Sequence, residues 1–343
     1  GTASSLLVEP ERTNLVTYSE DFSQWSATAI GTTLSVSTVI SPDGGQNAYK
    51  LKADGTNLFA RVDDVLSITS GDNIFYSVFL KKSDTHNIAT IRINGTNIGS
   101  SANNSTYEFD FSTETISRRT GGTAISTLVQ NVGNGWYRVG IELSNSTITS
   151  ASIYPSFNDA NGGEVLIWGA QLEEGSYATS YIPTDGGTVT RVQDQYSKTG
   201  ISNLIGQTKG TMFIDLNFIN ISNVQVLFSL HDGAVNKRLE IWASSAVVNG
   251  YIGGSVNIPI GATTITNGRH KIALAYDQSG NQAFYVDGVQ IGTSGTAYTI
   301  SALTTFSFNY FNNNIYFLNG SVNHTEIYKE RLTNEELATL TTI

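Results

Sequence analysis

The chain has 343 residues, a net charge of −10 and no cysteine. This length exceeds what one hydrophobic core usually absorbs, so two domains are expected, and disulfides and thiolate chemistry are excluded. Residues 1–184 carry 10 Lys and Arg against 18 Asp and Glu, whereas residues 185–343 carry 9 against 11. An acidic chain of this kind repels phosphate backbones, so we expect no nucleic-acid partner.

The composition favours β-strands joined by turns. Charged residues make up 14% of the chain and there are 33 glycines, with many Ser, Thr and Asn, which are turn-forming residues. No apolar run approaches the ~18 residues that a membrane span needs, so we expect no membrane insertion. The first five residues lack the regions of a signal peptide, and we expect the chain to be the C-terminal part of a longer protein.

Short alternating segments recur through the first half. Residues 74–80, 107–111 and 137–143 each place apolar side chains at every second position, which is the period of a half-buried strand. Turn residues separate them, for example at 42–45 and 133–135. Many short strands without a helical period between them predict an antiparallel sandwich or jelly roll.

The order of several sequence blocks in this half resembles the carbohydrate-binding-like jelly rolls of bacteriophage tail and fibre proteins. The resemblance covers nearly the whole half and implies the fold without naming a sugar. The blocks that carry it are Asn14–Trp25, Pro42–Gly44, Ala48–Leu51, Tyr76–Lys82, Gly135–Val139 and Gly169–Glu173.

Related jelly-roll modules often hold a structural calcium ion between their first and last strands. In this chain the resemblance points to Glu20, Asp21 and Glu173 as oxygen donors, and calcium takes six to eight oxygen ligands. The alternative is that these carboxylates are solvated turn residues.

The second half opens with residues 210–218, in which Met212, Ile214, Leu216 and Phe218 share one face. Residues 268–291 follow the strand period, turn within 277–281 and turn again at 287–288. This hairpin, which contains Tyr-Val-Asp-Gly, resembles the laminin-G and concanavalin A-like lectin and glucanase superfamily. The resemblance implies Asp232 as a calcium ligand, since calcium-binding laminin-G domains place an Asp after the corresponding strand.

One short helix is predicted at the C-terminus. Thr333 and Glu336 have the spacing of a capping box, and Leu332 and Leu337 that of a hydrophobic staple. The fold class is therefore all-β, with two tandem antiparallel β-sandwiches and a short C-terminal helix. We predict a first domain at 6–184, a linker at 185–208 and a second domain at 209–343.

Motifs for catalysis are missing from the sequence. Glucanases of the concanavalin A-like superfamily use two Glu that flank an Asp on one strand. The nearest segment in this chain is 213–217, where Phe213 and Asn217 occupy the positions of the two Glu. His-Glu-x-x-His, Gly-x-Ser-x-Gly and Walker sequences do not occur. We expect a protein that is not an enzyme.

Two places offer side chains suited to a sugar. Trp25 lies in a polar stretch, and an exposed indole presents a flat face to sugar C–H groups, although an amphipathic Trp also caps the end of a sandwich. The segment 309–314 combines aromatic rings with amides, and its candidate residues are Tyr310, Phe311, Asn312 and Asn314.

The two resemblances imply a non-catalytic, extracellular carbohydrate-binding adhesin of a phage virion. Its partners would be a polysaccharide or a host cell-surface glycan and other virion subunits, and phage fibres are usually trimers. Two alternatives are an architectural virion protein that binds no glycan and a polysaccharide depolymerase. An exposed apolar patch would favour the first, and a groove of aromatic and Asn side chains would favour glycan binding.

Overall fold

The computed structural model divides into two compact units. The first, called the first sandwich, spans Glu11–Val192; the second sandwich combines Gln193–Ile343 with the N-terminal segment that ends at Pro10. The residues that the structure describes are 5–25, 27–69, 71–83, 86–98, 102–144, 147–159, 163–219, 224–233, 237–300, 302–308, 316 and 318–343.

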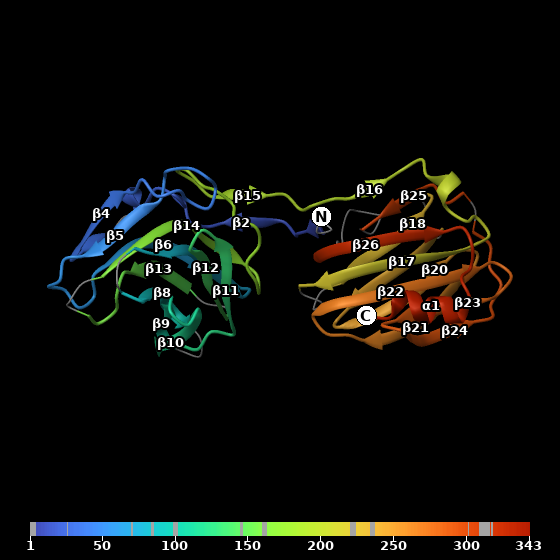
Figure 1. Ribbon diagram of the computed structural model, residues 1–343. Helices are drawn as coiled ribbons and strands as arrows, with labels where there is room; N and C mark the ends of the chain where they lie inside the picture. Colours follow the sequence, from blue (N-terminus) through green and yellow to red (C-terminus); the bar gives the residue numbers. More distant parts are fainter. Residues whose placement is uncertain are drawn as a thin grey trace. The chain divides into compact units, whose positions relative to one another are not determined.

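The first sandwich packs two six-stranded antiparallel sheets face to face (Figure 1). One sheet has the order β10-β9-β8-β13-β6-β3, and its strands are β3 Ala27–Ile30, β6 Arg61–Thr69, β8 Ile88–Ile98, β9 Ala102–Asp110, β10 Thr115–Gly121 and β13 Thr147–Tyr154. The other has the order β11-β12-β7-β14-β5-β4, and its strands are β4 Thr32–Val36, β5 Tyr49–Ala53, β7 Ile74–Lys82, β11 Ser126–Gly133, β12 Trp136–Leu143 and β14 Glu164–Glu174.

The central strand β7 shows how the sequence builds this core. Its alternate residues Ile74, Tyr76, Val78 and Leu80 are fully buried between the sheets, as the strand period predicts. Its other face is buried too, since Phe79 lies 5.1 Å from Trp168, ring centroid to ring centroid. Side chains on both faces of β7 are therefore buried, and the sequence from Ile74 to Leu80 is almost entirely hydrophobic.

The segment around β14 is held by a buried amide. Asn14, in β2 Arg12–Asn14, donates to the carbonyl oxygens of Ala170 and Ile182 and accepts from the backbone N–H of Leu172 at 3.1 Å. Gly169, with φ of +61°, lies where the register of β14 shifts against β7. β14 is an interior strand of its sheet, between β7 and β5.

The second sandwich also consists of two six-stranded antiparallel sheets. One has the order β1-β26-β17-β22-β23-β24, with β1 Leu6–Val8, β17 Lys209–Phe218, β22 Gly268–Asp277, β23 Gln282–Val286, β24 Val289–Ser294 and β26 Gly320–Tyr328. The other has the order β16-β25-β18-β19-β20-β21, with β16 Ser197–Lys198, β18 Gln225–His231, β19 Arg238–Ser244, β20 Val247–Gly253, β21 Asn257–Thr264 and β25 Thr305–Ser307.

The hairpin predicted at residues 268–291 is present. Ile272 pairs with Val286 across β22 and β23, and Asp287 and Gly288 take positive φ values of 50° and 81° at the next turn. His270 is hydrogen-bonded through both ring nitrogens, to Asp287 at 2.6 Å and to the carbonyl oxygen of Thr266 at 2.9 Å. Both ring nitrogens of His270 therefore have partners within the fold.

The ends of the two units differ from the predicted domain limits. β1 lies within the predicted first domain, 6–184, yet it pairs with β26 of the second sandwich, with Val8 opposite Gly320. β15 Val189–Arg191 lies within the predicted linker, 185–208, yet it pairs with β2 of the first sandwich. Both pairings join residues that are far apart in sequence, so local patterns do not reveal them.

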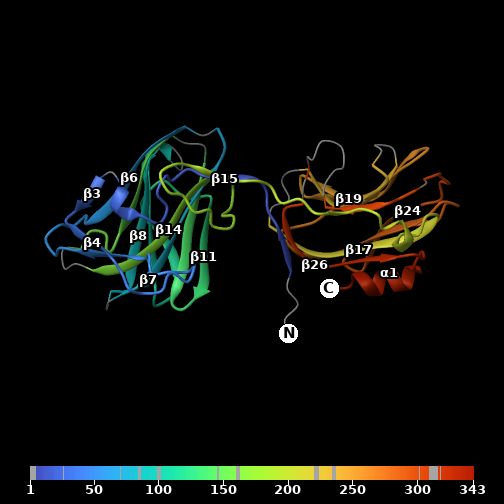
Figure 2. The same cartoon turned by 90° about the horizontal axis from the view of Figure 1, so that it is seen from above.

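The C-terminal helix forms as predicted. Thr333 caps α1 Asn334–Thr341, and its side chain accepts from the N–H of Glu336 while the Glu336 carboxylate accepts from the N–H of Thr333. Leu337 is fully buried against β17, β22 and β23, and Figure 2 shows α1 along the outer side of that sheet. Among the described residues, no helix is long and apolar enough to cross a membrane.

One carboxyl group lies in an unfavourable place in the first core. Asp64 in β6 is 7% exposed, and its Oδ2 has no hydrogen-bond partner among the described residues. Burial raises the pKa of this carboxyl from 3.8 to about 6. Because the folded protein binds this proton more tightly than the unfolded chain, the contribution of Asp64 to stability falls as pH rises from about 4 to about 6.

We predict that Asp64→Asn stabilises the protein increasingly as pH rises. The amide has no charge to bury, so the variant and the wild type should be similar near pH 4, and the variant should be more stable at pH 7. The gain is expected to be about 1–3 kcal/mol, because raising the pKa of Asp64 from 3.8 to about 6 corresponds to about 3 kcal/mol at pH 7 and solvent screening reduces it. Urea unfolding of both proteins at pH 4, 5.5 and 7 measures it, and a pH-independent difference would contradict the prediction.

Candidate functional site

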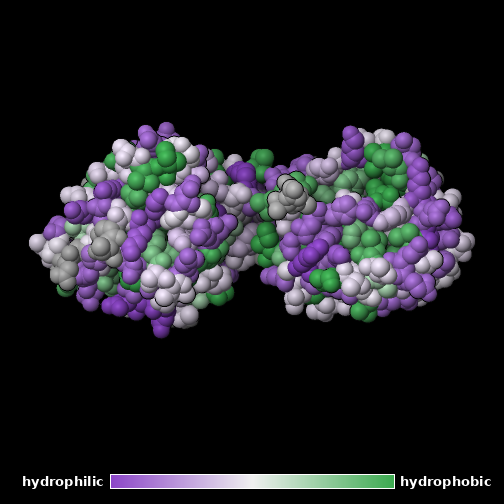
Figure 3. All heavy atoms as spheres, in the orientation of Figure 1, coloured by the Kyte–Doolittle hydropathy of each residue, from purple (hydrophilic) through white to green (hydrophobic). Residues whose placement is uncertain are grey.

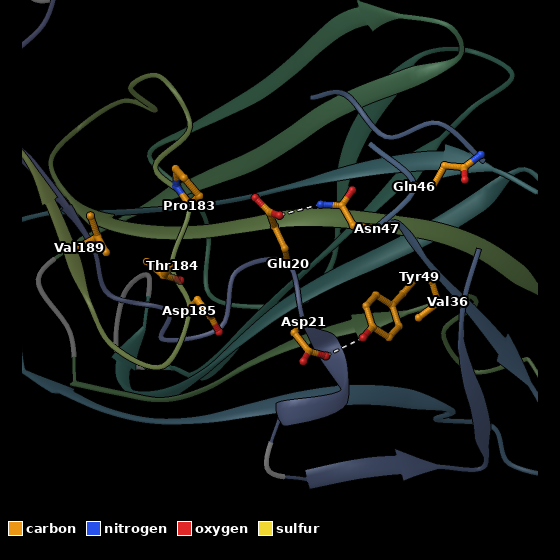
Figure 4. A pocket seen from close by; sticks show the side chains of 10 residues that line it. All are labelled: Glu20, Asp21, Val36, Gln46, Asn47, Tyr49, Pro183, Thr184, Asp185 and Val189. Atoms are coloured by element: carbon orange, nitrogen blue, oxygen red, sulfur yellow. Dashed lines mark hydrogen bonds between the residues drawn. The ribbon is translucent and has the colours of Figure 1, made fainter. Parts of the chain in front are cut away.

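A cleft of about 710 Å³ opens on the first sandwich. Figure 4 shows its polar side chains paired with one another, since Glu20 accepts from the amide of Asn47 at 2.7 Å and Asp21 accepts from the hydroxyl of Tyr49 at 2.6 Å. Asp21 also caps the short helix η1 Phe22–Gln24. These hydrogen bonds tie together the loops that form the cleft.

The electrostatics of this cleft are unfavourable for added negative charge. Burial raises the pKa of Glu20, and the charges of Asp43 and Asp185 raise it further. Hydrogen bonds from Tyr181 and Asn47 act in the opposite direction. The carboxylates in and around this cleft therefore already repel one another.

The predicted metal ligand Glu173 lies in a separate network. It is fully buried, and its carboxylate accepts from the N–H and hydroxyl of Thr179 at 2.9 and 2.7 Å and from the amide of Gln171 at 2.8 Å. Arg12 lies 3.8 Å away. These bonds fix the turn that follows β14, so both oxygens of Glu173 are already used.

The other predicted calcium ligand, Asp232, forms an ion pair with Lys237 at 3.2 Å. Within the described part of the chain, no three Asp, Glu, His or Cys side chains are placed to hold a metal ion together. The residues Glu20, Asp21 and Glu173 therefore do not fit one shared calcium site.

Trp25 does not offer the surface that its polar neighbours suggest. It is 2% exposed, its indole N–H donates to the carbonyl oxygen of Tyr18 at 2.9 Å, and its ring lies 4.8 Å from that of Phe22, centroid to centroid. The turn of η1 folds this segment onto the core, so Trp25 cannot stack on a sugar. The other predicted ligand residues, Tyr310, Phe311, Asn312 and Asn314, lie outside the described residues.

Of the four tryptophans in the chain, Trp242 alone is not buried. Trp136 and Trp168 are 1% and 2% exposed, and their indoles donate to the carbonyl oxygen of Ile40 and to the side chain of Asn47. Trp242 is half-buried on β19. It is therefore the tryptophan with ring surface available to a ligand.

Trp242 lies in a groove of about 290 Å³ on the outer face of the sheet that contains β18, β19 and β20. Small-molecule sites are typically apolar and aromatic with a few placed polar groups, and this groove has that composition. The residues that line it are Val224, Val226, Arg238, Glu240, Trp242, Tyr251 and Tyr316.

The alternation of β19 produces this groove. Leu239, Ile241 and Ala243 are fully buried in the core, so the residues between them must point outward. Across the ladder, Trp242 stands opposite Val226 and Glu240 stands opposite Tyr251. The backbone carbonyl of Tyr316 accepts from the N–H of Val226 at 2.7 Å, which brings Tyr316 to the same place.

A buried ion pair forms the polar part of the groove. Arg238 Nε lies 2.7 Å from Glu240 Oε2, and its guanidinium lies 5.0 Å above the centroid of the Tyr251 ring. Glu240 is only 3% exposed and stands opposite Ser229 across the ladder. Burial raises the pKa of Glu240, and the charge of Arg238 and hydrogen bonds from Arg238 and Ser229 oppose this effect.

The groove on β19 was not among the sites predicted from the sequence. The signal was present, because Arg238, Glu240 and Trp242 alternate with Leu239 and Ile241. Successive side chains of a strand point to opposite faces, so Trp242 points outward because Leu239 and Ile241 point inward. The contribution of Tyr316 had no comparable signal, since it depends on a long-range backbone hydrogen bond.

Comparisons with known proteins give structural neighbours only. No family model matches the sequence, and no curated protein matches it. The Ruminococcus gnavus IT-sialidase CBM40 bound to α2,3 sialyllactose is 15% identical, with a TM-score of 0.37 over 44% of this chain and 97% of that chain. The leech intramolecular trans-sialidase is 16% identical, with a TM-score of 0.38 over 43% of this chain and 26% of that chain.

The SAP-like pentraxin of Limulus polyphemus is 18% identical, with a TM-score of 0.33 over 40% of this chain and 70% of that chain. All of these similarities are too low to bear on what the chain binds.

Tryptophan fluorescence should report the exposure of Trp242. We predict that acrylamide quenches part of the native emission and that this part is lost in Trp242→Phe, because the other three indoles are buried. Tyr251→Phe, which keeps every tryptophan, serves as the control and should be quenched like the wild type. Undiminished quenching in Trp242→Phe would show that another indole is exposed.

Proposed function

We propose that this chain is a non-catalytic carbohydrate-binding protein that holds a sugar in the groove on β18, β19 and β20. The observation that carries the proposal is the partly exposed Trp242 beside the buried carboxylate of Glu240 in one groove. An indole face suits the C–H side of a sugar ring, and a carboxylate oxygen accepts from sugar hydroxyls. The two groups lie two residues apart on one strand face.

The remaining residues of the groove fit the same use. Tyr251 and Tyr316 add aromatic walls, while Val224 and Val226 add apolar surface. The hydroxyl of Tyr251 donates to Asn257 at 2.6 Å, which fixes the orientation of its ring. A rigid site of this kind loses little conformational entropy on binding.

A groove of about 290 Å³ is small, near the lower end of the range of roughly 300–1,000 Å³ for small-molecule sites. It accommodates a short piece of a glycan, and the affinity of one copy would be low. Several copies on one particle would raise the overall affinity through avidity. This property suits an adhesin better than a soluble carrier.

The proposal extends to the surface of a phage particle, where the chain would recognise a host cell-surface glycan. The sequence blocks of the first sandwich that resemble phage tail and fibre proteins support this step. Other virion subunits would be its protein partners, and a homotrimer would provide the copies. Negative-stain microscopy of the particle with an antibody against this chain tests the location.

The face drawn in Figure 3 gives less support to a purely architectural protein. On the face drawn in Figure 3, apolar side chains gather in several patches that polar side chains separate. An extensive contact with another virion subunit would favour one continuous apolar area. The groove, in contrast, combines apolar and polar groups at one place.

We predict that Trp242→Ala abolishes most glycan binding. Removal of a central aromatic anchor typically costs about 2 kcal/mol or more, so retention on a glycan array should fall about tenfold or more. The matched control is Phe59→Ala, which removes a 42% exposed aromatic from the first sandwich and should bind like the wild type. Both variants should unfold at the temperature of the wild type within a few degrees.

The array is read once with calcium and once with chelator, which tests whether binding depends on calcium. If the wild type retains no glycan under either condition, or if folded Trp242→Ala binds as well as the wild type, the proposed site is wrong.

A further inference from the structure

One end of the groove on β18, β19 and β20 is apolar. Val226 stands opposite Trp242 across the ladder, and the Cβ atoms of such a pair lie about 4.5–5.5 Å apart. Val224 lines the groove two residues before Val226, on the side away from the charged residues of β19. A backbone hydrogen bond of 2.7 Å from the N–H of Val226 to the carbonyl of Tyr316 brings that tyrosine to the same end. We call the part of the groove that these four residues line the apolar end.

The other end of the groove carries its two charged residues, and most of their hydrogen bonds are made within the protein. Arg238 Nε lies 2.7 Å from Glu240 Oε2, and the guanidinium lies 5.0 Å above the ring centroid of Tyr251. Glu240 also accepts from Ser229, its neighbour across the ladder. The hydroxyl of Tyr251 donates to Asn257 at 2.6 Å. Few hydrogen-bonding groups are therefore left in the groove for the hydroxyls of a sugar.

This division of the groove bears on the substituents of a bound sugar. A sugar ring that stacks on Trp242 places one of its substituents beside the valines, because Val226 is the cross-strand neighbour of Trp242. A hydroxymethyl group at this place loses hydrogen bonds to water and gains none from valine, which is unfavourable. A methyl group has no such bonds to lose, and its burial against apolar side chains is favourable. The apolar end therefore favours a methyl substituent.

We propose that the groove selects sugars that carry a methyl group, as 6-deoxyhexoses and N-acetylated sugars do, and that it binds this methyl group at the apolar end. The inference rests on the proposed function, because it names the class of sugar that the same site takes. Trp242 contacts the C–H face of the sugar ring. Val224 and Val226 contact the methyl group and determine the specificity.

The wild-type protein tests this selectivity on a glycan array. Each methyl-bearing sugar is presented beside the counterpart in which CH₃ is replaced by CH₂OH. L-Fucose with L-galactose and L-rhamnose with L-mannose test the deoxyhexose methyl group, and N-acetyl with N-glycolyl sugars test the acetamido methyl group. In one or both of these arms we expect the methyl-bearing member to be retained about tenfold or more over its counterpart, as is usual for such small differences in a hydrophobic site.

The variant Val224→Thr separates this selectivity from stacking on Trp242. It keeps the shape of the side chain but replaces one of its methyl groups by a hydroxyl, which can pair with a CH₂OH group. We expect the preference to fall to about threefold or less, a loss of about 0.7 kcal/mol of discrimination. Val224 is 38% exposed, so the fold should tolerate the change. The matched control is Val289→Thr on β24, 59% exposed and outside the groove, which should keep the wild-type preference.

Two results would overturn the inference while leaving the proposed function intact. One is wild-type binding in which no pair shows a preference for the methyl-bearing member. The other is a folded Val224→Thr variant whose preference equals that of the wild type and of Val289→Thr. Absence of binding to every glycan is a different result, since it removes the proposed function itself. If Val224→Thr does not fold, the paired comparison on the wild type still decides the matter.

Discussion

The two-residue period of the β-strand is the constraint on which both sandwiches depend. Each strand must bury one row of side chains between the sheets, and this fixes where the other row points. In β19 the buried row is Leu239, Ile241 and Ala243. Arg238, Glu240 and Trp242 are therefore on the outer face as a consequence of core formation, and a shift of one residue in register would bury charges and expose leucine. The groove and the core are two results of one pattern.

Buried polar groups determine the path of chain segments whose position the apolar pattern does not set. Asn14 uses both its amide N–H and its oxygen to join β2 to β14, and Gln171 donates to Glu173 and accepts from the N–H of Ile182. Such bonds are directional, so they set the path of the segment after β14, which no strand ladder holds. The carboxylate of Glu173 belongs to this network. Its oxygens accept hydrogen bonds within the fold, which explains why Glu173 does not share a metal site with Glu20 and Asp21.

Local sequence patterns predicted the local structure well. The hairpin at 268–291 and the cap at Thr333 follow from turn chemistry and strand period, and both formed as expected. Predictions failed where parts of the chain that are far apart in sequence come together. Trp25 has polar neighbours in the sequence but packs in the core of the first sandwich, and the strand Leu6–Val8 pairs with residues more than 300 positions away. Burial of a single side chain depends on the folded path of the chain around it, and a strand's partner depends on topology, so neither can be read locally.

The ion pair in the groove is hard to explain by stability alone. Removing Arg238 and Glu240 from water is costly, and apolar residues of similar size often stabilise a protein as well as a buried pair does. The ion pair with Arg238 and the hydrogen bond from Ser229 reduce the cost of burying Glu240 without removing it. The groove therefore keeps a charged pair beside the partly exposed Trp242, and this combination of polar and aromatic groups is the one on which the proposed sugar site depends.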